Sequence, residues 1–565
     1  MIKQISGSQM ISEALHEEGV EIVFGYPGGA ALNIYDETYK QTYFKHVLVR
    51  HEQAAVHAAD GYARVSGKVG VAFVTSGPGF TNAVTGLATA YSDSIPVVLI
   101  SGQVPTFMIG TDAFQEIDAV GISRPCVKHN FLVNSVEELP RIIKEAFYIA
   151  RSGRPGPVHI DIPKNVTSRL GDFVYPKEIS IPSYKPTYKG NSKQIKKAAA
   201  AINEAKRPLL YIGGGAVASN ASEIIRKFMK KTGIPAVETL MALGVLDAKD
   251  KLNLGMAGMH GSYASNMALS ECDLLISLGA RFCDRVTGKT DEFAKHAKII
   301  HIDIDPSSIS KIINAHYPIV GDLTNVLSEL YEEVKGEPKN YAPWREILDR
   351  YQKLNPLGYT DSDKVLKPQW VVEETAKIVG PEAIIATDVG QHQMWVAQFY
   401  PFNRARQLVT SGGLGTMGYG LPAAIGAKCA MPEHLVVNFT GDGSILMNIQ
   451  ELMTAYETNV PVINIILNNN FLGMVRQWQT FFYEKRYSST DLSLQPDFVK
   501  IAEGFGGVGF VCKSKDEFKK ALKEAIKSKK SALIDVRIDR FEDVLPMVPA
   551  GAAIYNMILK SKEEK

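Results

Sequence analysis

Short runs of apolar, β-branched residues alternate with helix-like patterns along nearly the whole chain. Such alternation is typical of βαβ units, which build parallel sheets covered by helices. We therefore predict an α/β fold with several parallel sheets. The runs are VEIVFG, KHVLVR, VGVAFVTS and PVVLISG in the first third, PLLYIGGG, DLLISLGA and KIIHIDID in the middle, and AIIATDVG, HLVVNFTGDG and VINIILNNN in the last third.

Two polar stretches interrupt this alternation, near residues 175–194 and 332–368, and both are rich in Pro and Lys. Composition of this kind is typical of linkers between domains. A chain of 565 residues is also long enough for several domains of the usual size, about 100 to 200 residues each. We predict three domains, at residues 1–175, 190–335 and 365–565.

Charge and cysteine usage exclude several classes of protein. The net charge is +2 and the basic residues are scattered, so no nucleic-acid surface is predicted. The five cysteines form no CxxC pair, which argues against a zinc site or a disulfide framework. The N-terminus lacks the apolar core of a signal peptide, and no apolar run approaches the roughly 20 residues needed to span a bilayer. We expect a cytoplasmic enzyme without a membrane anchor.

The most informative segment is HLVVNFTGDGSILMNIQELMTAYETNVPVINIILNNNFLG, residues 434–473. It predicts a strand, a GDG turn, an amphipathic helix, a second strand and an Asn-rich turn, which together form one βαβ unit. Asp442 and Asn469 then follow two neighbouring parallel strands, which lie about 4.8 Å apart. Both side chains can therefore reach one small cation.

Mg²⁺ prefers oxygen ligands and is usually held by one or two carboxylates together with phosphates and water. Asp442, Asn469 and the backbone carbonyl of Phe471 suit that role. Gly441 and Gly443 leave room for a diphosphate beside the backbone, and the N-terminus of the following helix favours negative charge. Taken separately, each half of this segment is better explained as an ordinary turn; the order and spacing of the two together favour the ion site.

Two other glycine motifs offer rival interpretations. GLGTMG at residues 413–418 follows the strand-like RQLVTS and satisfies the dinucleotide pattern, with Asp442 further along as a ribose-binding acid. That hypothesis leaves Gly443 and Asn469 without a role, so the diphosphate site is preferred. The tripeptide GKT at residues 288–290 resembles the end of a P-loop, but Cys283 stands where the motif requires glycine.

GDG followed at this distance by NN resembles the diphosphate and metal motif of thiamine-diphosphate enzymes. RHEQAAVHAADGYAR, residues 50–64, resembles their activating segment, with Glu52 at the matching position. Against the aminopyrimidine ring, a glutamic acid can exchange a proton with N1′; the imino form then removes the thiazolium C2 proton, and C2 attacks a keto acid. For Glu52 alone, an ion pair with Arg50 or His51 is the competing explanation.

Finer motifs resemble the catalytic subunits of the acetohydroxyacid synthase family, which join two 2-keto acids with loss of carbon dioxide. The resemblance extends over nearly the whole chain. It implies a pyrimidine domain, a central flavin-associated domain and a diphosphate domain. The motifs are GYPGGA (25–30), GTDAFQE (110–116), SGRPGPVHIDIPK (152–164), GMHG (258–261), GARFCDRVTG (279–288), GGLGTMGYGLP (412–422), GMVRQWQ (473–479) and VLPMVPAGAA near the C-terminus.

The resemblance also implies roles for individual residues. Gln115 and Lys164 would form the active-site wall, and Gly29 would lie beside the reacting centre. Met417 would be the apolar wedge that holds the cofactor bent. Trp478 would select the second keto acid, with core packing as the alternative. The implied thiamine-diphosphate contacts are Glu52, Gln391, His392, Gly415, Met417, Gly441, Asp442, Gly443, Ser444, Asn469, Phe471, Gly473 and Met474.

A second cofactor, FAD, is implied in the middle of the chain. Because joining two keto acids involves no net oxidation, a mainly structural flavin is expected. One departure from the family pattern is Cys283, where an acidic residue is usual. The implied FAD positions are Arg154, Gly213, Gly214, His260, Gly261, Gly279, Ala280, Arg281, Asp303 and Asp322.

The resemblance implies pyruvate and 2-ketobutyrate as substrates, a homodimer or homotetramer with each cofactor between two subunits, and a small regulatory subunit. Two rivals share the cofactor: a pyruvate oxidase and a catabolic acetolactate synthase without flavin. A nicotinamide-dependent oxidoreductase that uses GLGTMG, or a non-catalytic nucleotide-binding module, would leave Glu52 without a function. The flavin segments and GMVRQWQ favour the biosynthetic synthase.

Overall fold

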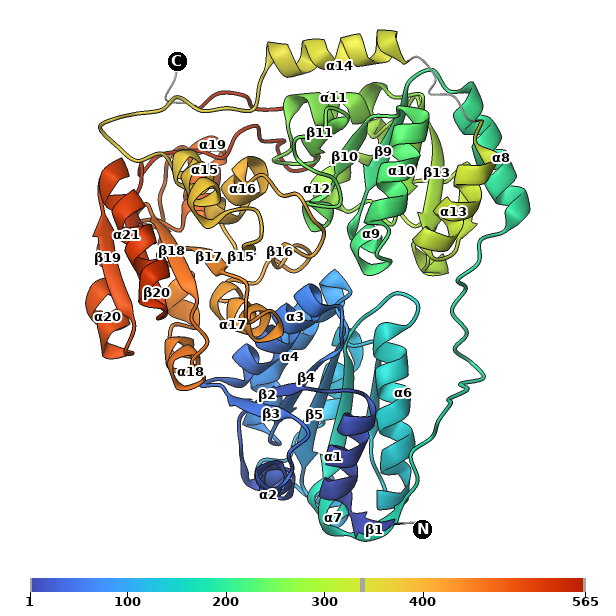
Figure 1. The fold of residues 1–565 in the computed structure, drawn as a ribbon, viewed down its shortest axis with the longest axis vertical. Helices are drawn as coiled ribbons and strands as arrows, with labels where there is room; N and C mark the ends of the chain where they lie inside the picture. The colour runs from blue at the N-terminus through green and yellow to red at the C-terminus, as the bar shows by residue number, and fades with distance from the viewer. Residues whose placement is uncertain (1–2, 336–340, 562–565) are drawn as a thin grey trace.

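A computed structural model describes residues 3–335 and 341–561 and contains three six-stranded parallel sheets (Figure 1). Residues 1–2, 336–340 and 562–565, which belong to the predicted end domains and the second predicted linker, lie outside the described residues. Each of the ten predicted apolar runs contains a strand of these sheets, so the predicted α/β class with parallel sheets is confirmed.

The first region, residues 3–173, has a sheet of order β3-β2-β4-β5-β7-β6. Val71 and Phe73 face one buried cluster and Ala72 and Val74 another, so both faces of the sheet are covered. The strands are β2 (Ile22–Gly25), β3 (Lys45–Leu48), β4 (Gly70–Val74), β5 (Val97–Gln103), β6 (His129–Leu132) and β7 (Val158–Pro163), with an antiparallel pair of β1 (Lys3–Ser6) and β8 (Leu170–Phe173). The helices are α1 (Gly7–Glu17), α2 (Leu32–Lys40), α3 (Glu52–Ser66), α4 (Pro78–Asp93), α5 (Ala119–Ser123), α6 (Leu139–Arg151) and α7 (Lys164–Ser168).

The central region begins at residue 192, and its sheet has the order β11-β10-β9-β12-β13-β14. In Figure 1 it is drawn mostly in green, above the blue first region. Its strands are β9 (Pro208–Ile212), β10 (Ala236–Glu238), β11 (Asn253–Met256), β12 (Leu274–Leu278), β13 (Lys298–Asp303) and β14 (Tyr317–Val320). Its helices are α8 (Ser192–Glu204), α9 (Gly214–Ala218), α10 (Ser222–Thr232), α11 (Tyr263–Glu271), α12 (Asp284–Thr287) and α13 (Leu323–Glu333).

The third region begins at residue 368, and its sheet has the order β16-β15-β17-β18-β20-β19. Its strands are β15 (Ile384–Thr387), β16 (Leu408–Val409), β17 (Val436–Gly441), β18 (Ile463–Asn468), β19 (Val508–Cys512) and β20 (Ala532–Arg537). Its helices are α15 (Pro368–Val379), α16 (Gln391–Phe399), α17 (Gly420–Ala430), α18 (Glu451–Glu457), α19 (Gly473–Phe482), α20 (Phe498–Gly504) and α21 (Lys515–Ser528). The chain beyond β20 returns to the central region, where Ala553 bridges to Gly288.

The two predicted linkers differ in structure. Residues 174–191, all of them described, form neither helix nor strand and run along the outside of the molecule (Figure 1). The second stretch instead contains α14 (Ala342–Leu354), which packs on the central core. Trp344 and Leu348 lie one helical turn apart and are buried there, and the Trp344 indole donates to the Pro208 carbonyl (3.2 Å). In the sequence, the only signal of this helix is a narrow stripe of apolar residues among polar ones, and the stretch therefore has the composition of a linker.

All three sheets share one topological feature. In each, the chain adds strands to one side of the first parallel strand and then continues on its other side. Connecting loops diverge at the carboxyl ends of the strands where this reversal occurs, and ligands of α/β proteins bind there. The reversal points lie between β2 and β4, between β9 and β12, and between β15 and β17. These three places are the candidate ligand sites.

Helices α3 and α17 join the first and third regions near the centre of the molecule (Figure 1). A Cβ added to Gly426 would lie 1.8 Å from the Ala58 carbonyl oxygen, and one added to Gly61 would lie 2.1 Å from that of Ala423. The two helix backbones are therefore in direct contact. In the described part of the chain, no helix is long and apolar enough to cross a membrane.

Gly426→Ala is expected to destabilise the protein by about 3 kcal/mol, because overpacking this contact outweighs a helix-propensity gain of about 1 kcal/mol. Thermal unfolding measures the effect. Gly504→Ala, in a helix where an added Cβ meets nothing within 4 Å, is the matched control and should be neutral or slightly stabilising. Equal melting temperatures for the two variants would contradict the close helix contact.

Candidate active site

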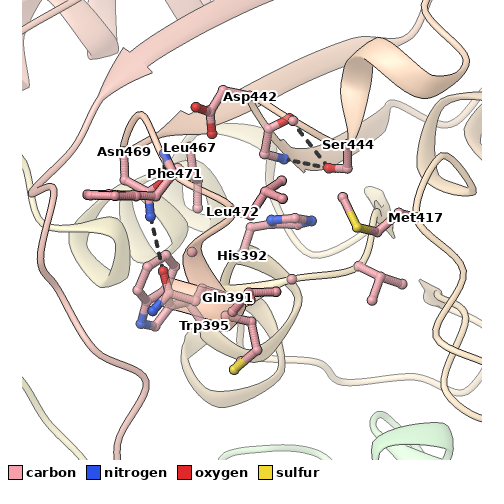
Figure 2. A pocket seen from close by; sticks show the side chains of 17 residues that line it. Gln391, His392, Trp395, Met417, Asp442, Ser444, Leu467, Asn469, Phe471 and Leu472 are labelled. Atoms are coloured by element: carbon pink, nitrogen blue, oxygen red, sulfur yellow. Dashed lines mark hydrogen bonds between the residues drawn. The ribbon is translucent and has the colours of Figure 1, made fainter. Parts of the chain in front are cut away.

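A pocket lies at the carboxyl ends of the third sheet, beyond β15, β17 and β18 (Figure 2). Eleven of the thirteen predicted thiamine-diphosphate contacts line it; Glu52 and Gly415 do not. Its lining residues are Val389, Gly390, Gln391, His392, Trp395, Met417, Gly441, Asp442, Gly443, Ser444, Leu467, Asn469, Phe471, Leu472, Gly473, Met474 and Val475.

Asp442 and Asn469 come together as the βαβ pattern predicts. They directly follow β17 and β18, which are parallel neighbours with Gly441 opposite Leu467. The Asn469 side chain donates to the Gln391 side chain (3.0 Å) and accepts from the Phe471 amide (3.1 Å). These two bonds fix the orientation of Asn469 at the edge of the pocket (Figure 2).

The Asp442 carboxylate has an unusual electrostatic environment. Burial raises its pKa to about 7, and the nearby Asp535 carboxylate acts in the same direction. The Gln495 side chain donates to Asp442 and accepts from the Asn468 side chain (2.7 Å). An ionised carboxylate in such a place is stabilised by a cation.

The donors around Asp442 match one kind of cation. The described residues contain no group of three or more His, Cys, Asp or Glu side chains placed to hold a metal ion. A cation beside Asp442 would therefore depend on one carboxylate, an amide oxygen, a backbone carbonyl and oxygens from a ligand. That combination suits Mg²⁺ bound together with a phosphate.

The predicted helix start directly after GDG is wrong. A short 3-10 helix, η8 (Ile445–Met447), follows the turn, and α18 begins only at Glu451. The Ser444 hydroxyl accepts from the Gly441 amide (3.1 Å), and the Asn448 side chain donates to the Gly418 carbonyl (2.7 Å). Such side-chain bonds to the backbone compete with helix formation.

Two other helices supply N-termini at this place. Helix α16 begins at Gln391 and α19 begins at Gly473, and both first turns line the pocket. The free amides and positive ends of helix N-termini bind phosphate groups. The pocket can therefore bind a diphosphate with two helices instead of the single predicted one.

Glycines and one histidine shape the pocket. A Cβ on Gly473 would lie 2.1 Å from the Gln391 side-chain oxygen, and one on Gly441 would lie 3.1 Å from the His392 ring. Burial lowers the pKa of His392 to about 3, so its ring is neutral. Its Nε2 is buried and has no hydrogen-bond partner among the described residues. A ligand with polar oxygens would satisfy it.

Met417 reaches the pocket from the GLGTMG loop (Figure 2). Buried Asp388, just after β15, accepts hydrogen bonds from the amides of Gly418 (2.8 Å) and Gly420 (3.3 Å). Gly415 lies in the same loop with φ +72° but does not line the pocket. Asp388, which the sequence did not single out, thus fixes the loop that carries Met417.

Glu52 is the first residue of α3 in the first region, outside this pocket. Its carboxylate accepts a hydrogen bond from the Asn82 side chain (2.9 Å). The Thr75 hydroxyl, just after β4, is buried and has no partner within the described ranges. A Cβ on Gly79 would lie 2.7 Å from the Thr75 side chain and 3.4 Å from the Glu52 carboxylate. Glu52 therefore lies beside the candidate ligand site at the reversal point of the first sheet, between β2 and β4.

The other residues implied near the reacting centre come from several elements. Gly29 follows β2 and has open space around it, and Lys164 begins α7 directly after β7. The backbone of Gln115 (φ +60°) lies against Gly77, close to the end of β4. Trp478 is half-buried on α19 and packs edge-on against Phe482 without lining the pocket.

The predicted FAD positions gather at the carboxyl ends of the central sheet, apart from Arg154, which comes from the first region and reaches Asp305 (3.4 Å). Five of them flank the reversal point between β9 and β12. The positions are Gly213 and Gly214 after β9, Gly279, Ala280 and Arg281 after β12, His260 and Gly261 after β11, Asp303 at the end of β13, and Asp322 after β14.

Several of these positions also have structural roles. A Cβ on Gly213 would lie 2.3 Å from the Gly279 carbonyl, so the backbones beyond these two strands pass in contact. Asp322 accepts from the Asn325 amide (3.1 Å), and His260 Nδ1 lies 3.2 Å from the Pro546 carbonyl. These contacts give some of the predicted FAD positions a structural role that does not depend on a bound flavin.

Models of the thiamine pyrophosphate enzymes match the chain in three parts. The N-terminal TPP binding domain matches residues 5–122, the central domain 195–330 and the C-terminal TPP binding domain 388–536. The acetolactate synthase large subunit of Haemophilus influenzae is 48% identical over 571 residues, covering 100% of each chain.

Two further relatives agree. The acetolactate synthase isozyme 3 large subunit of Escherichia coli is 46% identical and covers 100% of each chain. A probable acetolactate synthase large subunit of Methanocaldococcus jannaschii is 49% identical, covering 98% of this chain and 95% of its own. The chain therefore belongs to the acetolactate synthase large-subunit family of thiamine pyrophosphate enzymes.

Proposed function

We propose that this protein condenses pyruvate with a second pyruvate or with 2-ketobutyrate, releasing carbon dioxide and forming 2-acetolactate or 2-aceto-2-hydroxybutyrate. This is the first common step in the biosynthesis of valine, leucine and isoleucine. The observation that carries the proposal is the pocket where Asp442 and Asn469 meet two helix N-termini. Full-length relatives named acetolactate synthase support the same reaction.

The pocket fits thiamine diphosphate with Mg²⁺. The N-termini of α16 and α19 would bind the diphosphate, and the unpartnered ring nitrogen of His392 lies at the same pocket (Figure 2). Asp442, Asn469 and the Phe471 carbonyl would hold Mg²⁺. When bound, the thiazolium ring supplies an acidic carbon that adds to a keto group and accepts the electrons released by decarboxylation.

The chain's own residues would control one proton and the shape of the site. Glu52, oriented by Asn82, would hold a proton at the pyrimidine N1′ and take it back during the cycle. Met417 would be the wedge that holds the cofactor bent. Gln115 and Lys164 would form the wall around the keto acid, with Gly29 beside the reacting centre.

Glu52 and the diphosphate pocket would meet across two subunits, in a homodimer or homotetramer. Large apolar side chains are exposed in both parts, including Phe107 (75%) and Phe114 (87%) in the first region and Met447 (54%) and Val475 (50%) in the third. In the proposed oligomer these side chains would be covered where two subunits meet. Relatives named large subunits also support a small regulatory partner. The domains would be residues 1–175, 190–335 and 365–565.

FAD would bind at the reversal point of the central sheet, where open α/β sheets hold dinucleotides. Gly213, Gly214 and Gly279 would let the backbone approach it, and Arg154 and Arg281 would place positive charge near its phosphates. Because the proposed condensation involves no net oxidation, the flavin would have a structural role.

Trp478→Leu is expected to lower the preference for 2-ketobutyrate over pyruvate by about tenfold, because a reshaped pocket discriminates poorly between acceptors that differ by one methylene. A competition assay with both keto acids measures the product ratio. Phe482→Leu, which changes the aromatic partner of Trp478 one turn further along α19, is the matched control. An unchanged ratio in Trp478→Leu would assign this residue to core packing.

The proposed reaction is tested with purified protein, pyruvate, thiamine diphosphate, Mg²⁺ and FAD. Acetolactate, hydrogen peroxide and acetyl phosphate are measured in the same incubation. Acetolactate without peroxide is the expected result. Peroxide or acetyl phosphate without acetolactate would identify a pyruvate oxidase and overturn the proposal.

A further inference from the structure

Glu451, the first residue of α18, is a fully buried carboxylate that reaches from the third region into the first. Both of its oxygens lie within hydrogen-bonding distance of the Arg50 backbone amide (3.1 and 3.2 Å). The contact joins positions that are 401 residues apart in the sequence. A buried carboxylate is stable only when it has such hydrogen-bond partners. The contact therefore constrains both the start of α18 and the backbone at Arg50.

Arg50 belongs to the turn between β3 and α3, and Glu52 opens that helix two residues later. The His51 ring accepts from the Gln53 amide (3.2 Å) and caps the helix start. Glu451 is thus bonded to the backbone two residues before Glu52, while the Glu52 side chain itself is bonded to Asn82. The position of the Glu52 backbone depends on this turn.

A second residue of α18 supports the same turn. The Thr454 hydroxyl donates to the Glu451 carboxylate (2.6 Å) and lies 3.3 Å from the Leu48 carbonyl at the end of β3. Burial raises the pKa of Glu451 to about 7, whereas the Thr454 hydroxyl and the Arg50 and His51 amides lower it. The Glu451 carboxylate therefore accepts hydrogen bonds from the backbone of the turn and from the Thr454 hydroxyl.

We propose that Glu451 is a positioning residue for Glu52: its bond to the Arg50 amide sets the turn from which the Glu52 carboxylate extends. The inference rests on the proposed proton transfer by Glu52. Glu451 also lies on the segment that follows the GDG turn. The segment that binds Mg²⁺ and the diphosphate in one active site would therefore hold in place the Glu52 that belongs to the other active site of the dimer.

The test compares Glu451→Gln with Glu457→Gln in the full-length protein loaded with thiamine diphosphate, Mg²⁺ and FAD. Glu457 lies on the same helix and pairs with the Arg50 side chain, so its variant removes a neighbouring contact between the same regions. NMR measures exchange of the cofactor C2 proton, and titration measures cofactor affinity. Hydrogen–deuterium exchange measures protection of the amides in the turn.

Glu451→Gln is expected to slow C2 proton exchange about tenfold or more, because small displacements of a reacting group have large effects on rate. Cofactor affinity should be unchanged, and the Arg50 amide should exchange faster with solvent. Glu457→Gln should leave C2 exchange near the wild-type rate. If Glu451→Gln does not fold, Glu451→Asp, which keeps the charge but shortens the side chain, should show a smaller change of the same kind.

Wild-type C2 exchange in Glu451→Gln or, where that variant does not fold, in Glu451→Asp would overturn the inference. A loss of cofactor affinity that accounts for the slower exchange would also overturn it, since that result indicates a purely structural role. Glu52→Gln is measured in parallel. If it too exchanges at the wild-type rate, the proposed function of Glu52 has failed, and this outcome is distinct from failure of Glu451 alone.

Discussion

Asp442→Ala is expected to weaken Mg²⁺-dependent binding of thiamine diphosphate by about 100-fold or more, since even residues behind a metal ligand change affinity 10- to 100-fold. Asp442 supplies the only carboxylate among the proposed Mg²⁺ ligands, and an amide and a carbonyl oxygen do not replace its charge. Calorimetric titration of the cofactor at several Mg²⁺ concentrations measures the loss.

The matched control for this change is Asp516→Ala, an exposed aspartate in the first turn of α21, away from the pocket. It should bind the cofactor like the wild type. Retention of wild-type affinity and Mg²⁺ dependence by Asp442→Ala would show that the diphosphate site lies elsewhere.

Glu52→Gln is expected to lower the rate of acetolactate formation by about 10²- to 10⁴-fold, the range attributed to general acid–base catalysis. The amide has nearly the same size as the acid and can still contact Asn82, but it cannot exchange a proton with the pyrimidine ring. Cofactor affinity should change little, because Glu52 lies outside the diphosphate pocket. Steady-state kinetics and cofactor titration separate the two effects.

Glu21→Gln, an exposed glutamate of the same region, serves as the control for Glu52→Gln and should retain activity. Near-wild-type turnover in Glu52→Gln would remove the proton-transfer role. An equal loss of activity and of cofactor affinity would instead indicate that Glu52 mainly binds the cofactor.

The strands that the sequence predicted are dominated by apolar residues, such as the LLISL of β12. Strands with other patterns were not singled out. In β7, buried His159 and Asp161 interrupt the apolar run and bond to Ser101, and β10 contains only three residues. Because polar residues inside a sheet are satisfied by partners on other strands, a local pattern does not reveal them.

The candidate site was predictable where its residues follow consecutive strands. Asp442 and Asn469 meet because β17 and β18 are neighbours, and that adjacency follows from a single βαβ unit. The helix N-termini of α16 and α19 were not predicted as the diphosphate cradle. The GDG turn itself suggested a helix, but Ser444 and Asn448 form bonds to the backbone there instead.

The supporting residues could not be found from the sequence. Asn82 lies 30 residues from Glu52, Gln495 lies 53 residues from Asp442, and Glu451 lies 401 residues from Arg50. Each is an ordinary polar residue in its local segment, without a motif of its own. Only the folding of distant segments against one another gives each of these residues its role.

The most direct test of the composite site uses Glu52→Gln and Asp442→Ala together. The two chains are co-expressed with different affinity tags, and oligomers that contain both are isolated. If one subunit supplies Glu52 and its partner supplies the diphosphate pocket, a mixed dimer contains one intact site, and about half of the wild-type acetolactate activity should return. Mixed oligomers as inactive as each variant alone would contradict a site built from Glu52 and Asp442 of different subunits.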